Sequence, residues 1–360
     1  MNGKISICVV LFLLAAGFNI ISGDTTSSEV KREPTRGFDD FKMDMNISEA
    51  SIASFIGEKA EDHAFIISGA GDVNGDGYDD ILIGAFFNDY GGTMAGQTYL
   101  IFGKSSGWSM DTDLSNADAS FLGENAEDWS GLSVSGAGDV NGDGFDDILV
   151  GAKNNDDGGR DSGQTYLIFG KSSGWSMDTD LSNADASFWG ENADDRASSQ
   201  SGACDVNGDG YDDILIGAGG NDDGGTDAGQ TYLILGKSSG WSMDMDLSNA
   251  DASFLGEDAD DRASSPSGAG DVNGDGYDDI LINAAGNDDG GYHAGKTYLI
   301  TPHSASDPLE VYDITVKNDL GEDLTIADKL DIVHVEVTGL DSNSSNKDRA
   351  RVNVTFSSTT

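Results

Sequence analysis

Cysteine, proline and basic residues are scarce in this sequence. Two Cys and four Pro occur among 360 residues, and 19 Lys and Arg face 65 Asp and Glu. Cys8 lies in an N-terminal apolar segment, so Cys204 is the one thiol outside it, and no disulfide framework is possible within one chain. The formal net charge of −46 argues against nucleic acid or an anionic membrane surface as a partner, because both repel such a chain.

No long apolar stretch occurs after the N-terminal segment. Ile5–Ala16 is almost wholly apolar, follows Lys4, and gives way to small residues up to Gly23. This pattern predicts a secretory signal peptide over residues 1–23, with an uncleaved anchor as the alternative. We therefore expect a secreted or cell-surface (extracellular) protein, with a linker over residues 24–45. Sequons that permit glycosylation occur at Asn46, Asn343 and Asn353.

An internal repeat dominates the rest of the sequence. The string Asp-Val-Asn-Gly-Asp-Gly-(Tyr/Phe)-Asp-Asp begins at Asp72, Asp139, Asp205 and Asp271. Gly-Gln-Thr-Tyr-Leu-Ile and Lys-Ser-Ser-Gly-Trp-Ser-Met-Asp recur at matching distances. Four units of about 66 residues cover residues 46–303, and such regularity predicts stacked copies of one supersecondary unit.

The pattern inside each unit is typical of short β-strands. Apolar residues alternate with polar ones between turns rich in Gly, Asn and Asp, and no segment keeps a helical period. In the second unit we expect strands at 120–123, 131–135, 147–152 and 164–169. Four strands per unit predict an all-β fold, in which each unit is either a propeller blade or a β-hairpin solenoid unit.

The aspartate-rich string has the spacing of a calcium loop. In the second unit, counted from Asp139, oxygen side chains fall at positions 1, 3, 5 and 9, and Phe145 at position 7 offers its carbonyl. Glycines at positions 4 and 6 allow a tight curl. Three carboxylates, an amide and a carbonyl suit Ca²⁺, which takes 6–8 oxygen ligands.

Two other interpretations of this string remain. An EF-hand needs a Glu at position 12 between two helices, whereas Val150 stands there within an apolar β-like run. An EF-hand is therefore disfavoured. A simple turn rich in Asp and Asn would explain one copy, but four copies that keep every ligand position favour a cation site.

These residues resemble the FG-GAP repeat family, the calcium-binding β-propeller repeats of integrin α subunits (integrin alpha N-terminal-like). The resemblance rests on Ala70–Ala85 and its three copies. It implies one propeller blade per repeat, with up to four Ca²⁺ bound in β-hairpins on the face away from the ligand, where they are mainly structural. The ligands that it implies are Asp72, Asn74, Asp76, Tyr78 and Asp80; Asp139, Asn141, Asp143, Phe145 and Asp147; Asp205, Asn207, Asp209, Tyr211 and Asp213; and Asp271, Asn273, Asp275, Tyr277 and Asp279.

The sequence departs from the family pattern at several places. The Phe-Gly of the family corresponds to His63-Ala64, Ser130-Gly131, Arg196-Ala197 and Arg262-Ala263, and its Pro to Phe86, Lys153, Gly219 and Ala285. Asn283 replaces a Gly in the fourth unit. In the third and fourth units the second strand loses its apolar positions to Ser198, Gln200, Ser264 and Pro266, so we expect these two blades to be looser.

Blade number is open, because integrin-type propellers have seven blades and this chain has four repeats. The repeats could close as a small ring, associate between copies to complete a larger one, or represent a truncated product. A C-terminal β-rich segment follows over residues 304–360, with strands expected at 309–316, 331–337 and 351–356. Three strands are typical of an incomplete immunoglobulin-like sandwich.

Other repeated residues favour structural roles. The Asn-Asp-Asp-Gly-Gly loops at Asn155, Asn221 and Asn287 have no alternate oxygen spacing, so we expect turns rather than second ion sites. Trp108, Trp175 and Trp241 share a repeat position, which favours packing between blades over a sugar-binding platform.

The predicted function follows from the resemblance. We expect an extracellular binding or adhesion module with a protein or glycan ligand. No nucleophile–base–acid set is present, and we predict no catalytic residues and no enzymatic activity. The alternatives are an accessory module of a secreted hydrolase and a structural surface-coat protein.

Overall fold

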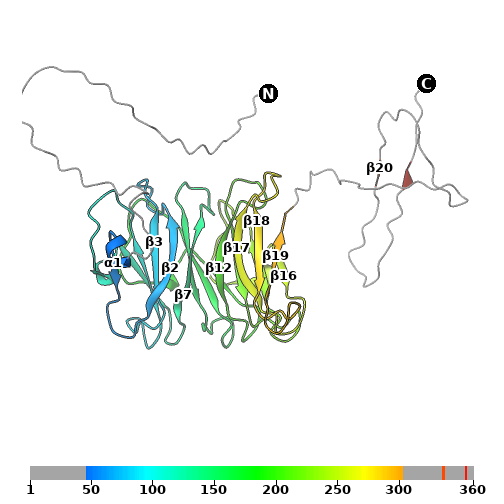
Figure 1. Ribbon diagram of the computed structural model, residues 1–360, viewed down its shortest axis with the longest axis horizontal. Helices are drawn as coiled ribbons and strands as arrows, with labels where there is room; N and C mark the ends of the chain where they lie inside the picture. Colours follow the sequence, from blue (N-terminus) through cyan, green and yellow to red (C-terminus); the bar gives the residue numbers. More distant parts are fainter. Residues whose placement is uncertain (1–45, 303–334, 337–352, 355–360) are drawn as a thin grey trace, which may run out of the picture. The chain divides into compact units, whose positions relative to one another are not determined.

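The computed structural model describes residues 46–302, 335–336 and 353–354. The chain divides into two units, Met1–Thr301 and Pro302–Thr360. In the first unit, four antiparallel sheets follow one another in chain order, and each is a blade of a β-propeller (Figure 1). The predicted all-β propeller is therefore confirmed, and the solenoid alternative is wrong.

Each blade is built from the same succession of strands. Blade 1 contains β2 (Ala64–Gly71), β3 (Asp80–Ala85), β4 (Gln97–Ile101) and β6 (Ala119–Leu122). Blade 2 contains β7 (Ser130–Gly138), β8 (Asp147–Ala152), β9 (Gln164–Ile168) and β11 (Ala186–Trp189). Blade 3 contains β12 (Ala197–Cys204), β13 (Asp213–Ala218), β14 (Gln230–Ile234) and β16 (Ala252–Leu255). Within the described residues, blade 4 contains β17 (Ala263–Gly270), β18 (Asp279–Ala284) and β19 (Lys296–Ile300).

Short elements join the blades at their outer edges. The two-residue strands β1 (Phe55–Ile56), β5 (Thr112–Asp113), β10 (Thr179–Asp180) and β15 (Met245–Asp246) pair in parallel as β5 with β1, β10 with β6, and β15 with β11. One α-helical turn, α1 (Ile47–Ala50), precedes the blades, and 3-10 turns cover Leu114–Asn116, Leu181–Asn183 and Leu247–Asn249.

The sequence repeat and the blade are offset by one strand. The segment expected as the first strand of the second unit is β6, and β6 pairs with β4 of blade 1, with Phe121 opposite Thr98. β11 and β16 likewise join the blade that precedes their own repeat. Each blade therefore takes its outer strand from the start of the following repeat.

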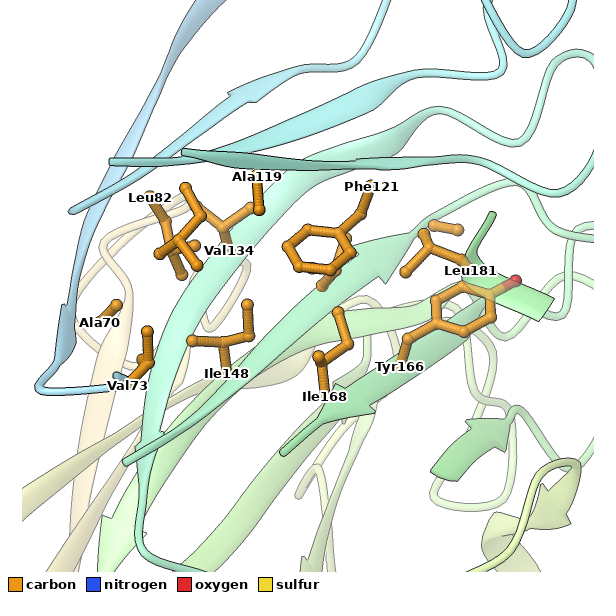
Figure 2. Packing of buried hydrophobic residues seen from close by; sticks show 13 residues of the cluster. Ala70, Val73, Leu82, Ala119, Phe121, Val134, Ile148, Tyr166, Ile168 and Leu181 are labelled. Atoms are coloured by element: carbon orange, nitrogen blue, oxygen red, sulfur yellow. The ribbon is translucent and has the colours of Figure 1, made fainter. Parts of the chain in front are cut away.

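The hydrophobic core lies between the blades. One cluster joins Leu82 and Phe121 of blade 1 to Val134, Ile148 and Tyr166 of blade 2, all of them buried (Figure 2). Equivalent clusters join blades 2 and 3 and blades 3 and 4. Burial of apolar area on this scale is the main driving force for folding, so each blade depends on its neighbour for stability.

Burial contradicts the expectation that the third blade is loose. Every residue of β13 and β14 is buried, and Ser198 and Gln200 of β12 are only 5% and 8% exposed. Blade 4 is more exposed because no further described blade covers it. Val272 is 53% exposed, whereas its counterparts Val73 and Val140 are fully buried.

Glycine allows the close approach of neighbouring blades. A Cβ atom at Gly84, Gly151 or Gly217 would lie closer than 3.0 Å to a backbone carbonyl oxygen of the next blade, a distance that real Cβ atoms do not show. Asn283 occupies this position in blade 4, where its Nδ2 donates to Thr297 Oγ1 at 3.1 Å. Blade 4 therefore cannot accept another blade in the geometry that the first three blades use.

An aspartate also links successive blades, and Cys204 interrupts the pattern. The backbone N–H of Asp72 donates to Asp146 Oδ2 at 2.7 Å, and that of Asp139 donates to Asp212 Oδ2 at 2.8 Å. The residues before these donors are glycines with φ near +75°, and a Cβ atom on either would meet the accepting carboxylate. Cys204 has φ +60°, and in the described blades no equivalent bond joins the N–H of Asp205 to Asp278.

The second unit is described at Pro302 and at four strand residues. β20 (Val335–Glu336) and β21 (Asn353–Val354) pair antiparallel and fall inside two of the three strands expected there. The immunoglobulin-like sandwich otherwise lies outside the described residues, as do the signal peptide and the linker. Within the described part of the chain, no helix is both long and apolar enough to span a bilayer.

We predict that Gly217→Ala lowers the free energy of unfolding by about 2 kcal/mol, since overpacking at a close backbone approach typically costs about 1–3 kcal/mol. Asn283→Ala at the same repeat position is the matched control and should cost less than about 1 kcal/mol, because its side chain faces no further blade. Urea unfolding of both variants measures the difference. Equal effects would contradict this account of the blade contact.

We predict that Cys204→Gly raises the free energy of unfolding by about 1–2 kcal/mol. Glycine adopts the left-handed backbone conformation at this position without steric strain. The loss of the Cβ atom also makes room for a hydrogen bond from the N–H of Asp205 to Asp278. Cys204→Ala keeps a Cβ atom and should leave stability nearly unchanged. A gain in Cys204→Ala equal to that in Cys204→Gly would instead attribute the effect to the thiol.

Candidate calcium loops and relatives

Each candidate calcium loop joins the first and second strands of a blade. The four loops connect β2 to β3, β7 to β8, β12 to β13 and β17 to β18. Since the strands of each sheet are antiparallel, these hairpins share one edge of the propeller. The structure thus places all four predicted sets in β-hairpins, and no α-helix flanks them, which removes the EF-hand interpretation.

The aspartate at position 1 organises the loop. Asp139 Oδ1 accepts hydrogen bonds from the N–H groups of Gly142 and Asp143, at 2.7 and 3.0 Å, and its Oδ2 accepts from Gly144 at 2.9 Å. Gly142 and Gly144 adopt φ angles of +75° and +91°, which glycine tolerates at no steric cost. Asp72, Asp205 and Asp271 accept equivalent bonds in the other loops.

Positions 3 and 5 turn toward the same loop backbone. Asn141 Oδ1 accepts from the N–H of Asp143 at 2.8 Å, and Asp143 Oδ1 accepts from the N–H of Phe145 at 3.1 Å. Each carboxylate oxygen has more than one lone pair, so these bonds leave capacity for a cation. The residues at positions 1, 3 and 5 are exposed or half-buried, and an ion can reach them from solvent.

Position 9 differs from the other ligand positions because it is buried. Asp147 Oδ2 accepts from the N–H of Val140 at 3.0 Å, and Oδ1 accepts from the N–H of Gly170 at 2.8 Å. Burial raises the pKa of Asp147 to about 8, against the lowering effect of these two bonds, and the charges of Asp143 and Asp139 raise it further. The pKa values of Asp80 and Asp213 rise to about 6, again chiefly through burial.

The charge of these loops is not balanced by nearby cations of the protein. Ion pairs in the described residues are limited to Arg160 with Asp194 and Lys296 with Glu257 and Asp289. Carboxylates at positions 1, 5 and 9 therefore repel one another, which is the arrangement that a divalent cation would relieve. In the same residues, no three or more His, Cys, Asp or Glu side chains converge as a metal-binding group in their present positions.

The aromatic residue at position 7 has a packing role that the sequence analysis missed. A Cβ atom at Gly75 would lie within 3.0 Å of the Phe145 ring of the next blade. Tyr211 covers Gly142 and Tyr277 covers Gly208 in the same way, whereas nothing lies over Gly274 of the last loop. An aromatic residue at this position in all four repeats was the available signal. Each of the first three loops is therefore closed by the blade that follows it.

A buried polar network occupies the opposite edge of each blade. Asn155, fully buried, donates from Nδ2 to Asp128 Oδ2 at 3.2 Å and to Tyr166 Oη at 3.3 Å. Asn88 and Asn221 make the same contacts in their blades. The Asn-Asp-Asp-Gly-Gly loops are thus turns whose first residue is a structural anchor.

The repeated tryptophans pack between strands. Trp175 contacts Phe102 and Phe121 edge-on, and its Nε1 donates to Lys171 O at 2.7 Å. Trp108 and Trp241 make similar contacts. Their packing role is therefore confirmed.

The residue that precedes each inner strand shows which residues align with the Phe-Gly position of the family. β7 is one residue longer than the other inner strands. As a result Trp129, with φ +56°, takes the place of His63, Arg196 and Arg262, which have φ between +54° and +58°. Trp129 rather than Ser130 therefore corresponds to the two arginines.

Comparison with known proteins agrees with this architecture. The family model described as "FG-GAP repeat" matches residues 66–101, 130–168, 198–234 and 264–300. "Integrin alpha pat-2" of Caenorhabditis briggsae is 36% identical over 86 residues, which is 24% of this chain and 7% of that protein. "Integrin alpha-6" of Gallus gallus is 29% identical over 152 residues, 41% of this chain and 12% of that protein.

The chain therefore spans only a small part of the length of these relatives. The matched segments begin in the inner strands and end with the third strand of each blade, so each contains one of the hairpins described above. The four matches lie in the predicted repeats, so this chain contains four FG-GAP repeats, and integrin alpha subunits are among its relatives.

Proposed function

We propose that this protein is an extracellular adhesion module, a secreted or cell-surface propeller that binds a protein or glycan ligand and carries out no catalysis. One observation supports this most: the same oxygen-rich hairpin recurs at the blade contacts in a chain whose relatives are named integrin alpha. The formal net charge of −46 would repel nucleic acid, so nucleic acid is not a proposed partner.

Calcium is the proposed cofactor, with up to four ions held by the loops. Asp139, Asn141 and Asp143 supply accessible oxygens, and Asp147 supplies a buried carboxyl group beside them. A bound cation would favour the ionised form of Asp147 and reduce repulsion inside the loop. Since the next blade closes the first three loops, bound ions would also strengthen the contacts between blades.

The proposed role of the ions is structural. An ion that binds only the folded form at a concentration a hundred times its Kd adds about 2.7 kcal/mol. Four such sites would contribute on the order of the whole stability of an ordinary domain, about 5–15 kcal/mol. The loops therefore need not touch the ligand in order to matter for its binding.

Association of copies to complete a larger propeller is restricted by blade 4. A following blade would approach Asn283, where the first three blades carry glycine. A second copy could complete a ring only with a changed contact at this face.

We predict that a chelator lowers the melting temperature of the protein and that added Ca²⁺ restores it. Asp143→Asn should reduce the stabilisation by Ca²⁺ by about 2.7 kcal/mol at hundredfold saturation, because it removes one ligand charge from one site. Glu127→Gln is the control, since it removes an exposed charge outside the loops. An unchanged melting temperature in chelator, with no uptake of Ca²⁺ in a titration, would contradict the calcium proposal.

We predict that the purified protein is retained on an array of extracellular proteins and glycans in Ca²⁺, and less so in chelator as the blades loosen. The array measures retention, and reaction products from the same glycans are analysed in parallel. No retention together with ordered self-assembly would favour a surface-coat protein. Turnover of a glycan would contradict the non-enzymatic assignment.

A further inference from the structure

Three of the few basic residues converge on one cavity at the edge opposite the calcium loops. Lys153 follows β8, whereas Arg196 and Arg262 precede β12 and β17. They belong to blades 2, 3 and 4, yet all three line one cavity of about 320 Å³. The positive charges of both arginines lower the pKa of Lys153, after the larger effect of its burial, so the three groups act on one another.

These three side chains have no acidic partner in the described residues. The ion pairs found there involve only Arg160 and Lys296 as cations, although acidic residues far outnumber basic ones. Asp227 is the one carboxylic residue that lines the cavity. Mutual repulsion of three unpaired cations is unfavourable, and a bound anion would relieve it.

The rest of the lining is rich in hydroxyl groups. Ser133, Ser198, Ser199 and Ser264 line the cavity together with Gly219 and Gly220, and Leu132 is the single large apolar residue among the lining residues. Hydroxyls can both donate and accept hydrogen bonds, as sugar hydroxyls do. A volume of about 320 Å³ lies at the lower end for small-molecule sites, about 300–1,000 Å³.

We propose that this cavity binds the carboxylate of an acidic sugar residue, with Arg196, Arg262 and Lys153 holding the carboxylate and the serines holding the ring hydroxyls. The inference rests on the proposed extracellular binding function and names the ligand class. The guanidinium groups suit the two oxygens of a carboxylate. A long polyanion is disfavoured by the charge of the whole protein, so a glycan with isolated acidic residues fits best.

The neighbouring part of the same edge is different in character. His63, Phe65, Phe86, Phe87 and Trp129 contact one another there as an aromatic cluster. Trp129 and the two arginines occupy the same position in successive repeats, so basic character begins at blade 3. The site therefore belongs to particular repeats and is not a property of every blade.

The test is calorimetric titration of the full chain in Ca²⁺ with glucuronate and, as the neutral control, glucose. Glucuronate should bind and glucose should bind at least about tenfold more weakly. Arg196→Gln and Arg262→Gln should each weaken glucuronate binding about tenfold or more. Arg160→Gln, which removes an exposed arginine paired with Asp194 outside the cavity, should not change it.

Melting curves of each variant separate loss of the site from loss of the fold. Both arginines are exposed, so the variants should melt as the parent protein does. Equal binding of glucuronate and glucose, or unchanged binding in both cavity variants, would overturn the inference. Array retention on neutral ligands that survives Arg196→Gln would overturn it too while leaving the adhesion function intact, whereas absence of any retention would count against that function.

Discussion

Close contact between successive blades is the constraint on which the rest of this structure depends. Only small residues fit where β3, β8 and β13 meet the carbonyl oxygens of the next inner strand, and the apolar clusters lie in the same interfaces. The calcium-loop hairpins are part of these interfaces, because each of the first three is covered by an aromatic ring from the following blade. Stability, loop geometry and blade order are thus aspects of one contact repeated along the chain.

Sequence reasoning could predict most of this architecture because the repeat carries it. Strict spacing of the Asp139 string and its copies placed all four loops, and alternation of apolar residues located the strands. The sequence analysis placed the outer strand of each blade in the following blade, since nothing in a repeating sequence marks where one sheet ends. Pairing of β6 with β4 is a long-range choice that depends on which edge is free, and periodicity contains no information about it.

The positions of the loop residues could be predicted from the sequence, whereas their burial and hydrogen bonds could not. Alternate oxygens at Asp139, Asn141 and Asp143 follow from spacing, whereas the hydrogen bond that Asp147 accepts from Gly170, beyond the end of β9, does not. The loss of apolar positions at Ser198 and Gln200 suggested a weak blade, yet burial by neighbouring strands offsets it. A cavity assembled from three blades, such as that of Lys153, Arg196 and Arg262, cannot be seen in any one repeat.

The one-strand offset between repeat and blade also bears on how the molecule resists damage. Because β6, β11 and β16 each begin the repeat that follows their own sheet, each of the first three blades takes its strands from two successive repeats. A single proteolytic cut between β4 and β6 would leave β6 on the C-terminal fragment but still hydrogen-bonded to β4 of blade 1, so the two fragments would stay paired. Neighbouring repeats are therefore joined by shared sheets. Whole repeats could be lost or gained in evolution without removing the outer strand of a sheet.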